Sequence, residues 1–132
     1  MATEFEDRSA FSPLKLAHIV FDEISFKRLG FQGKKEKEAQ LWFGKCVEKV
    51  DKDLYQVSLS AKAVQEDEYE AIVSISGYCE ISEDEPNKDH ILNENAIAIL
   101  FPYVRAELIL LTAQPETKPL TIPAVNINAC PI

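Results

Sequence analysis

Residues 97–111, IAILFPYVRAELILL, decide the fold, because this stretch is long enough for a helix and has no polar side. At 3.6 residues per turn, one side of such a helix carries Ile97, Leu100, Phe101, Val104, Leu108 and Leu111. The other side carries Ile99, Tyr103, Ala106 and Leu110. The only charges, Arg105 and Glu107, point roughly 200° apart, so no solvated stripe forms.

A helix of this kind needs cover on two sides. We expect one side to pack on the chain's own sheet and the other on a partner subunit; a central helix buried in a larger monomer is the alternative. The residues predicted for the oligomer interface are Ile97, Ile99, Leu100, Val104 and Leu111.

Composition indicates one domain of ordinary size. The chain has 132 residues, of which 46% are hydrophobic, and we expect a single domain over residues 1–132 with residues 1–13 as a loose N-terminal arm. The formal net charge of −8 argues against nucleic acid or an anionic membrane as the main partner, because both require clustered Lys and Arg.

The sequence favours a cytoplasmic protein without a metal. Cys46, Cys79 and Cys130 are widely spaced and form no zinc-binding pattern, so we interpret them as reduced thiols. The N-terminus, MATEFEDRSA, has no apolar segment typical of a secretory signal. The apolar run at residues 96–111 is shorter than the ~20 residues of a membrane span, so we exclude membrane insertion.

Before the helix the chain alternates apolar and polar residues, which is typical of strands. The four predicted strands lie at residues 14–27, 38–50, 55–63 and 69–80. In the first, the apolar residues change from odd to even positions, which predicts a bulge near Asp22 and Glu23. The last two form an antiparallel hairpin, whereas the ten-residue loop at residues 28–37 is long enough to place the second strand away from the first.

Two features bound the helix. Asp89 or Asn93 is placed to cap its start, and Pro102 predicts a kink or a break with a second segment beginning at that residue. Beyond Leu111 four prolines predict an extended C-terminal segment lying on the body, anchored by Val125 and Ile127.

Motifs for catalysis are missing from the sequence. His18 and His90 have no local Ser, Cys or Asp arrangement typical of a nucleophile, and no glycine loop has the spacing that cradles a phosphate. We therefore expect no enzyme and no cofactor. The residues alone predict a soluble α+β oligomer that binds something.

Residues 100–105 read L-F-P-Y-x-R, which resembles the helix signature of the SecB family of export chaperones. The likeness extends to Ile24-Ser25-Phe26 at the end of the first strand, Asp53-Leu54-Tyr55 before the third, and LTIPAVNINA at residues 120–129. It implies a four-stranded antiparallel sheet with a crossover between strands 1 and 2, one long kinked helix packed on it, and a homo-oligomer that is a dimer or a tetramer built as a dimer of dimers.

The resemblance also implies a function: an ATP-independent holdase that binds unfolded polypeptides in apolar grooves, for protein export. Aromatic and branched side chains expected in that groove are Phe26, Phe31, Trp42, Phe101, Tyr103 and Leu108. Glu23 matches a family acid that contacts the translocase motor SecA, but Lys27 stands where a second acid is expected, and the family's second helix and SecA-binding tail have no counterpart.

Two other functions stay open. Some SecB-like proteins are dedicated chaperones of an antitoxin, which needs the same groove and one client. An oligomeric ligand-binding or scaffold domain could keep the fold without the holdase role.

Overall fold

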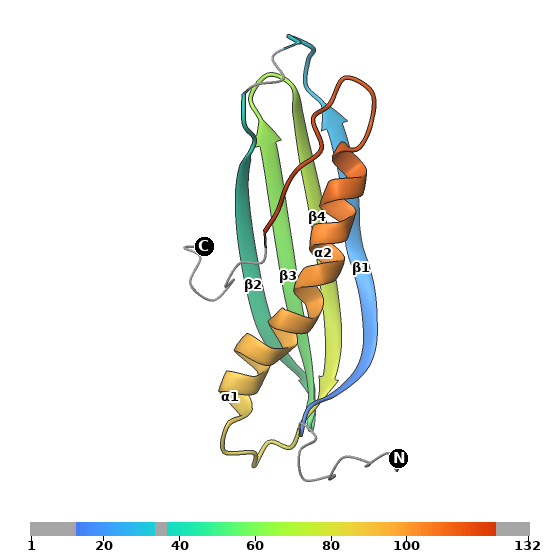
Figure 1. The fold of residues 1–132 in the computed structure, drawn as a ribbon. Helices are drawn as coiled ribbons and strands as arrows, with labels where there is room; N and C mark the ends of the chain where they lie inside the picture. Colours follow the sequence, from blue (N-terminus) through green and yellow to red (C-terminus); the bar gives the residue numbers. More distant parts are fainter. Residues whose placement is uncertain (1–12, 34–36, 124–132) are drawn as a thin grey trace, which may run out of the picture.

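A computed structural model of the chain describes residues 13–33 and 37–123. It forms one antiparallel sheet in the order β1-β4-β3-β2, with a long helix across one face (Figure 1). The strands are β1 (Lys15–Arg28), β2 (Gln40–Asp51), β3 (Leu54–Gln65) and β4 (Tyr69–Glu80). The predicted fold class and the crossover are confirmed, because β1 and β2 lie at opposite edges of the sheet.

The predicted bulge in β1 is confirmed. The pairing of β1 with β4 shifts between Phe21 and Glu23, and a second shift between Leu16 and His18 was not predicted. The first shift moves the helix-side residues from odd to even numbers, so that Phe21 faces Ile75 and Phe26 faces Ala71. Both stretches of β1 therefore direct apolar side chains to the same face.

A two-residue turn, Lys52-Asp53, joins β2 to β3 and holds the beginning of the loop that leads from β4 to the helix. Asp53 adopts a positive φ of 57°, which Asp tolerates better than most residues. The backbone N–H of Ile81 donates to the Asp53 carbonyl (3.1 Å), and that of Glu83 donates to the Asp53 carboxylate (2.8 Å). Lys49 pairs with Glu83 beside this turn.

One continuous helix, Lys88–Thr112, follows the sheet. It consists of α1 (Lys88–His90), the π-helical segment η2 (Ile91–Asn95) and α2 (Ala96–Thr112). The predicted cap was wrong: the helix begins after Asn87 without a side-chain cap, and the Asn93 side chain donates to the Asp89 carbonyl one turn back.

The predicted break at Pro102 was also wrong, because α2 runs through that residue. A proline leaves the carbonyl four residues earlier without its helical donor. Here Ala98 and Pro102 are both exposed, so water can satisfy the freed carbonyl group. The bend of the helical rod in Figure 1 fits the two usual causes of helix bending, a proline and a π-helical turn.

The core lies between α2 and the middle strands. Every second residue of β3 and β4 faces the helix and is buried, as the alternation predicted. These residues include Val57, Leu59, Ala61, Ala63, Tyr69, Ala71, Val73, Ile75 and Cys79. Leu100 of α2 rests on Gly77 of β4, where an added Cβ would lie 3.1 Å from Leu16 and 3.3 Å from Leu100.

Residues 113–123, which we call the strap, run back beside α2 in front of β3 (Figure 1). The backbone N–H of Leu120 donates to the buried Thr112 hydroxyl (2.9 Å), which itself donates to the Leu108 carbonyl (2.9 Å). Ile122 is buried in the core. The extended C-terminal segment is thus confirmed as far as residue 123, whereas Val125, Ile127 and the arm before residue 13 lie outside the described residues.

The helix Lys88–Thr112 has 25 residues and is long and apolar enough to cross a membrane. The prediction that the chain does not span a membrane rests on the apolar run at residues 96–111, which is shorter than this helix. The helices of soluble cores pass the same test, and one side of this helix packs on the sheet. The absence of membrane insertion therefore stays a prediction.

Because Gly77 seats the helix, Gly77→Val should lower the free energy of unfolding by about 1–3 kcal/mol, measured by chemical denaturation. Gly44→Val, which adds the same side chain to the partly exposed outer face of β2, is the matched control and should cost less than ~0.5 kcal/mol. Equal losses in both variants would contradict the seating of Leu100 on Gly77.

Candidate functional site

The outward side of α2 is an apolar stripe that the described part of the chain, residues 13–33 and 37–123, leaves largely exposed. Exposed fractions are 41% for Ile99, 47% for Tyr103 and 66% for Leu110, and Ala106 between them is also exposed. We call these four residues the α2 stripe. Exposure of three large apolar side chains in one row is typical of a contact surface.

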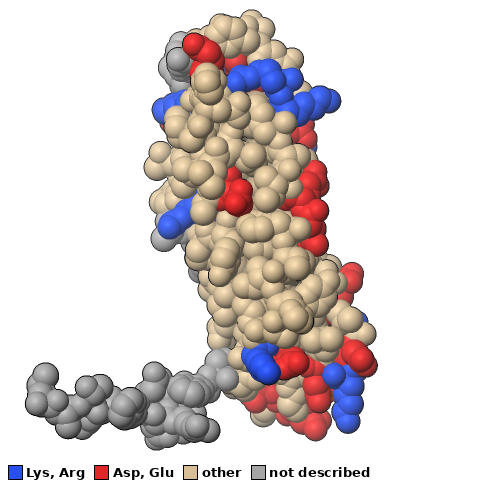
Figure 2. All heavy atoms as spheres, turned by 90° about the vertical axis from the view of Figure 1, so that its right-hand side faces the viewer, with Lys and Arg blue, Asp and Glu red and all other residues tan. Residues whose placement is uncertain are grey.

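The α2 stripe leans toward the edge strand β1. Phe101 packs on Phe43 of β2 with ring centroids 5.8 Å apart, and Tyr103 lies roughly 160° around the helix from Phe101. On the helix side of β1, Phe21 and Ile24 are exposed as well. Figure 2 views this side, where uncharged side chains cover most of the surface and acidic groups gather along one edge.

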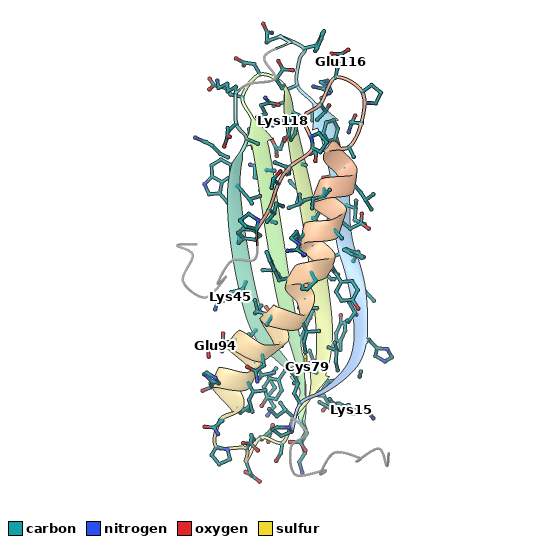
Figure 3. All side chains as sticks on the ribbon, viewed as in Figure 1. Lys15, Lys45, Cys79, Glu94, Glu116 and Lys118 are labelled. Atoms are coloured by element: carbon teal, nitrogen blue, oxygen red, sulfur yellow. The ribbon has the colours of Figure 1, made fainter. Side chains whose placement is uncertain are left out.

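A recess, which we call the strap pocket, lies on the side of α2 opposite the α2 stripe. Its volume is about 340 Å³, and the strap forms one wall. Other lining residues come from the start of β2, the end of β3 and the start of β4. The lining residues are Lys37, Glu38, Ala39, Leu41, Gln65, Tyr69, Lys118, Pro119, Leu120, Thr121 and Ile122. Figure 3 shows Lys118 on the strap, at the end of the sheet opposite Lys15.

The lining of the strap pocket is mixed, with apolar side chains such as Leu41 and Ile122 beside polar and charged ones. Leu41 and Tyr69 reach the pocket because both lie on the helix side of the sheet, where Leu41 pairs with Ala63. Burial raises the pKa of the Tyr69 hydroxyl, and the charge of Arg28 partly offsets this effect. Tyr69 is therefore a neutral hydrogen-bonding group at neutral pH.

Glu68 organises the loops at this end of the molecule, and its side chain is only 5% exposed. Its carboxylate accepts hydrogen bonds from the backbone N–H of Gln32 (2.7 Å) and from the Arg28 guanidinium (3.4 Å). Its backbone carbonyl accepts a hydrogen bond from the N–H of Leu29 (2.8 Å). A buried carboxylate needs such partners, and these tie the loop after β1 to the β3–β4 turn.

The residues predicted for a polypeptide-binding groove do not form one surface. Tyr103 lies on the α2 stripe, and Phe31 is 60% exposed in the loop after β1. Phe26 is partly buried and stacks on Tyr69, with ring centroids 5.1 Å apart. Trp42 pairs with Lys62 on the outer face of the sheet, away from the helix.

Phe101 and Leu108 require a correction, because both are buried in the core against the chain's own sheet. The helical period shows which residues share a side. It does not show which side meets the sheet, and here the side with Phe101 and Leu108 does.

The predicted interface residues divide in the same way. Ile97, Leu100 and Val104 are buried against the sheet, Leu111 is partly buried, and Ile99 faces outward. Ile97, Leu100 and Val104 cannot contact a partner subunit because, like Leu108, they are buried against the chain's own sheet.

Glu23 lies on the outer face of the sheet opposite Ser74 and accepts a hydrogen bond from the Ser25 hydroxyl (3.2 Å). Lys27 lies on the same face opposite Glu70. The same face carries hydrogen-bonded serine pairs of β3 and β4, Ser58 with Ser76 and Ser60 with Ser74. Among the described residues no three His, Cys, Asp or Glu side chains gather into a metal site.

Sequence reasoning missed the strap pocket, Arg28 and Glu68. Arg28 continues the even-numbered helix-side positions of Ile24 and Phe26, so its place on the core face could have been predicted. Glu68 belongs to the acidic run QEDE, which is typical of a solvated turn, and no sequence signal distinguishes it from Glu66. The pocket depends on where the strap lies, which the sequence pattern does not specify.

The structure is similar to that of the SecB-like chaperone Rv1957 of Mycobacterium tuberculosis, solved in complex with a ChAD peptide from the Rv1956 HigA1 antitoxin. The TM-score is 0.70 at 16% identity, covering 85% of this chain and 90% of that chain. The chain has a SecB-like fold. A Streptococcus agalactiae protein of unknown function is also similar, with a TM-score of 0.52 at 14% identity over 84% of this chain and 97% of that chain.

Comparison of the sequence with known proteins gives less information than comparison of the structure does. No family model matches the sequence. The uncharacterized protein MJ0357 of Methanocaldococcus jannaschii is 38% identical over 56 residues, which make up 42% of this chain and 36% of that protein. The match thus spans about a third of that relative.

Two neighbouring leucines of α2 test the division of the helix into sides. Leu108→Ala should lower the free energy of unfolding by about 2–5 kcal/mol, because it leaves a cavity against the sheet. Leu110→Ala, the matched control on the α2 stripe, should change it by less than ~0.5 kcal/mol in the monomer. Thermal or urea unfolding of both variants at low protein concentration measures the difference. A larger loss for Leu110→Ala would reverse the assignment of sides.

Proposed function

We propose that the chain is a molecular chaperone that binds non-native polypeptides in the cytoplasm without using ATP. The observation that carries the proposal is the strap pocket, a recess of about 340 Å³ with Leu41, Leu120 and Ile122 in its lining that is large enough for one large apolar side chain of an extended client. Burial of apolar surface is non-directional and accepts many sequences, so no nucleotide-driven step is needed for binding.

The similarity to Rv1957 supports binding of a peptide by this fold. Two kinds of client are proposed. One is a range of unfolded preproteins bound for export, for which the L-F-P-Y-x-R signature is the support. The other is a single antitoxin, because the similar structure holds a SecB-like chaperone in complex with a peptide from an antitoxin. Contact between Glu23 and SecA belongs to the first proposal only.

We further propose that the chain assembles as a homo-oligomer, a dimer or a tetramer, through the α2 stripe and the exposed residues Phe21 and Ile24 of β1. The strap pocket lies on the opposite side of α2, so it stays accessible in such an assembly. The apolar interface and the client surface are then separate, which replaces the mixed residue sets predicted from the sequence.

The direct test is suppression of aggregation. At equimolar ratio and without nucleotide, the purified chain should slow the aggregation of a chemically denatured substrate, followed by light scattering. Leu41→Gln, at the pocket wall, should weaken this effect about tenfold, since a buried leucine contributes ~1.5–3 kcal/mol. Val50→Gln, on an exposed part of the same strand, is the control and should behave as the wild type.

A panel of unrelated denatured substrates separates the two client classes in this assay. Broad suppression supports the export role, and suppression confined to one antitoxin supports the dedicated role. Absence of any delay, with every substrate, would defeat the chaperone proposal.

The assembly is tested by light scattering coupled to gel filtration. The wild type should have a mass that is a whole multiple of 14.9 kDa, and Tyr103→Lys with Leu110→Lys should reduce it to the monomer, because two charges would be buried in an apolar contact. Phe31→Lys changes an equally exposed aromatic residue away from the stripe and should leave the mass unchanged. A wild type that is monomeric at every concentration would contradict the proposed assembly.

A further inference from the structure

Three segments far apart in the sequence meet at Arg28, the last residue of β1. Its guanidinium donates one hydrogen bond to the buried Glu68 of the β3–β4 turn (3.4 Å) and another to the hydroxyl of Thr117 in the strap (2.6 Å). The third segment is the loop after β1, which Glu68 holds through the backbone N–H of Gln32 (2.7 Å). Arg28 thus connects the strap to the place where the loop after β1 meets the β3–β4 turn, which we call the loop junction.

Contacts with Phe26 and Glu68 hold the Arg28 side chain in place independently of the strap. Its guanidinium lies over the Phe26 ring, 5.6 Å from the centroid, and Phe26 in turn stacks on Tyr69, which lines the strap pocket. Glu68 is buried, so its charge stays directed at the guanidinium. A planar donor held by a ring and a carboxylate presents its remaining N–H groups in one direction, toward Thr117.

Other contacts hold the strap nearer its two ends, among them a hydrogen bond from the Gln114 side chain to the Leu111 carbonyl. The residues between Thr112 and Leu120 are mostly exposed, and the strap is held at its far end by the bond from the Leu120 N–H to Thr112 and by the buried Ile122. The turn at residues 114–117 includes Glu116 at a positive φ of 59°, a conformation that costs free energy, and is closed by a hydrogen bond from the Thr117 N–H to the Gln114 carbonyl (3.3 Å). Arg28 adds a bond from the sheet to this turn at Thr117.

We propose that Arg28 is a positioning residue that fixes the strap against the loop junction and thereby sets the shape of the strap pocket for its client. The effect of Arg28 on client binding rests on the proposed function. The effect of Arg28 on the position of the strap does not depend on that function. Loss of the Arg28 bridge frees residues 113–120, so the wall carrying Pro119 and Leu120 no longer has one position. Client affinity then falls because part of the binding free energy is used to order the strap.

The first test is hydrogen exchange of the unliganded full chain, resolved to single amides. Arg28→Met keeps the stem over Phe26 and removes both hydrogen bonds. Thr117→Val keeps Arg28 and removes the acceptor in the strap, together with the hydrogen bond that the Thr117 hydroxyl donates to the Pro115 carbonyl (3.2 Å). Both should speed exchange at Leu120 about tenfold or more, since the local opening free energy falls by one charge-assisted hydrogen bond. Lys27→Met, at the neighbouring outer-face residue, is the control and should leave this exchange unchanged.

The second test is the dissociation constant of a fluorescent apolar peptide cut from a denatured client. It should rise about fivefold to tenfold in Arg28→Met and in Thr117→Val, and the double variant should be no weaker than Arg28→Met alone, because both changes remove one link. Arg28→Lys should restore part of the affinity, since an ammonium reaches one partner but not both. If the two substitutions weakened binding only by lowering the stability of the fold, their effects on the free energy of binding would be additive.

The outcomes separate the inference from the function it serves. Unchanged Leu120 exchange in Thr117→Val, which keeps Glu68 paired with Arg28, overturns the inference whether or not peptide binds. Faster exchange with an unchanged dissociation constant overturns the link to the pocket. If the wild type binds no peptide, the chaperone proposal fails, and exchange at Leu120 still decides whether Arg28 holds the strap.

Discussion

The whole structure depends on one constraint: α2 has apolar side chains around its full circumference, and a single sheet can cover only part of it. The chain resolves half of the problem by seating Leu100 on Gly77, where a missing Cβ lets the helix approach β4. Ile97, Val104 and Leu108 follow into the same core. The cost is the uncovered α2 stripe, and its apolar exposure beside the edge strand β1 is what gives the proposed assembly its physical reason.

A second constraint, at one end of the sheet, concerns polar groups. The buried Glu68 carboxylate needs donors, and the two that it has, the Gln32 N–H and the Arg28 guanidinium, bring the loop after β1 and, through Arg28, the strap to one place. The strap in turn forms a wall of the pocket on the β2 side of the helix. The two sides of α2 thus differ in kind: an open stripe suited to a rigid partner, and a walled recess suited to a single inserted side chain.

Much of this fold could be predicted from the sequence, because strands of period two and a parity change in β1 leave direct traces in residue order. The length of the loop at residues 28–37 allowed the second strand to lie away from the first, and in the order β1-β4-β3-β2 the two are at opposite edges. The break at Pro102 and the caps failed, because tertiary packing on the sheet supports the helix more strongly than local signals oppose it. The two sides of the helix could be listed but not oriented, so Phe101 and Leu108 were placed at a surface that they do not reach. The Arg28–Glu68 pair depends on contacts 40 residues apart and leaves no local pattern.

The central claim is that the α2 stripe is covered by another copy of the chain. Hydroxyl-radical footprinting of the wild type, read by mass spectrometry at low and at high protein concentration, tests it at the residue itself. Tyr103 should be oxidised readily in dilute solution and become protected as the concentration rises, while Phe31, exposed and away from the stripe, should react equally at both. Equal oxidation of Tyr103 at both concentrations, in a sample shown to be oligomeric at the higher one, would contradict the account.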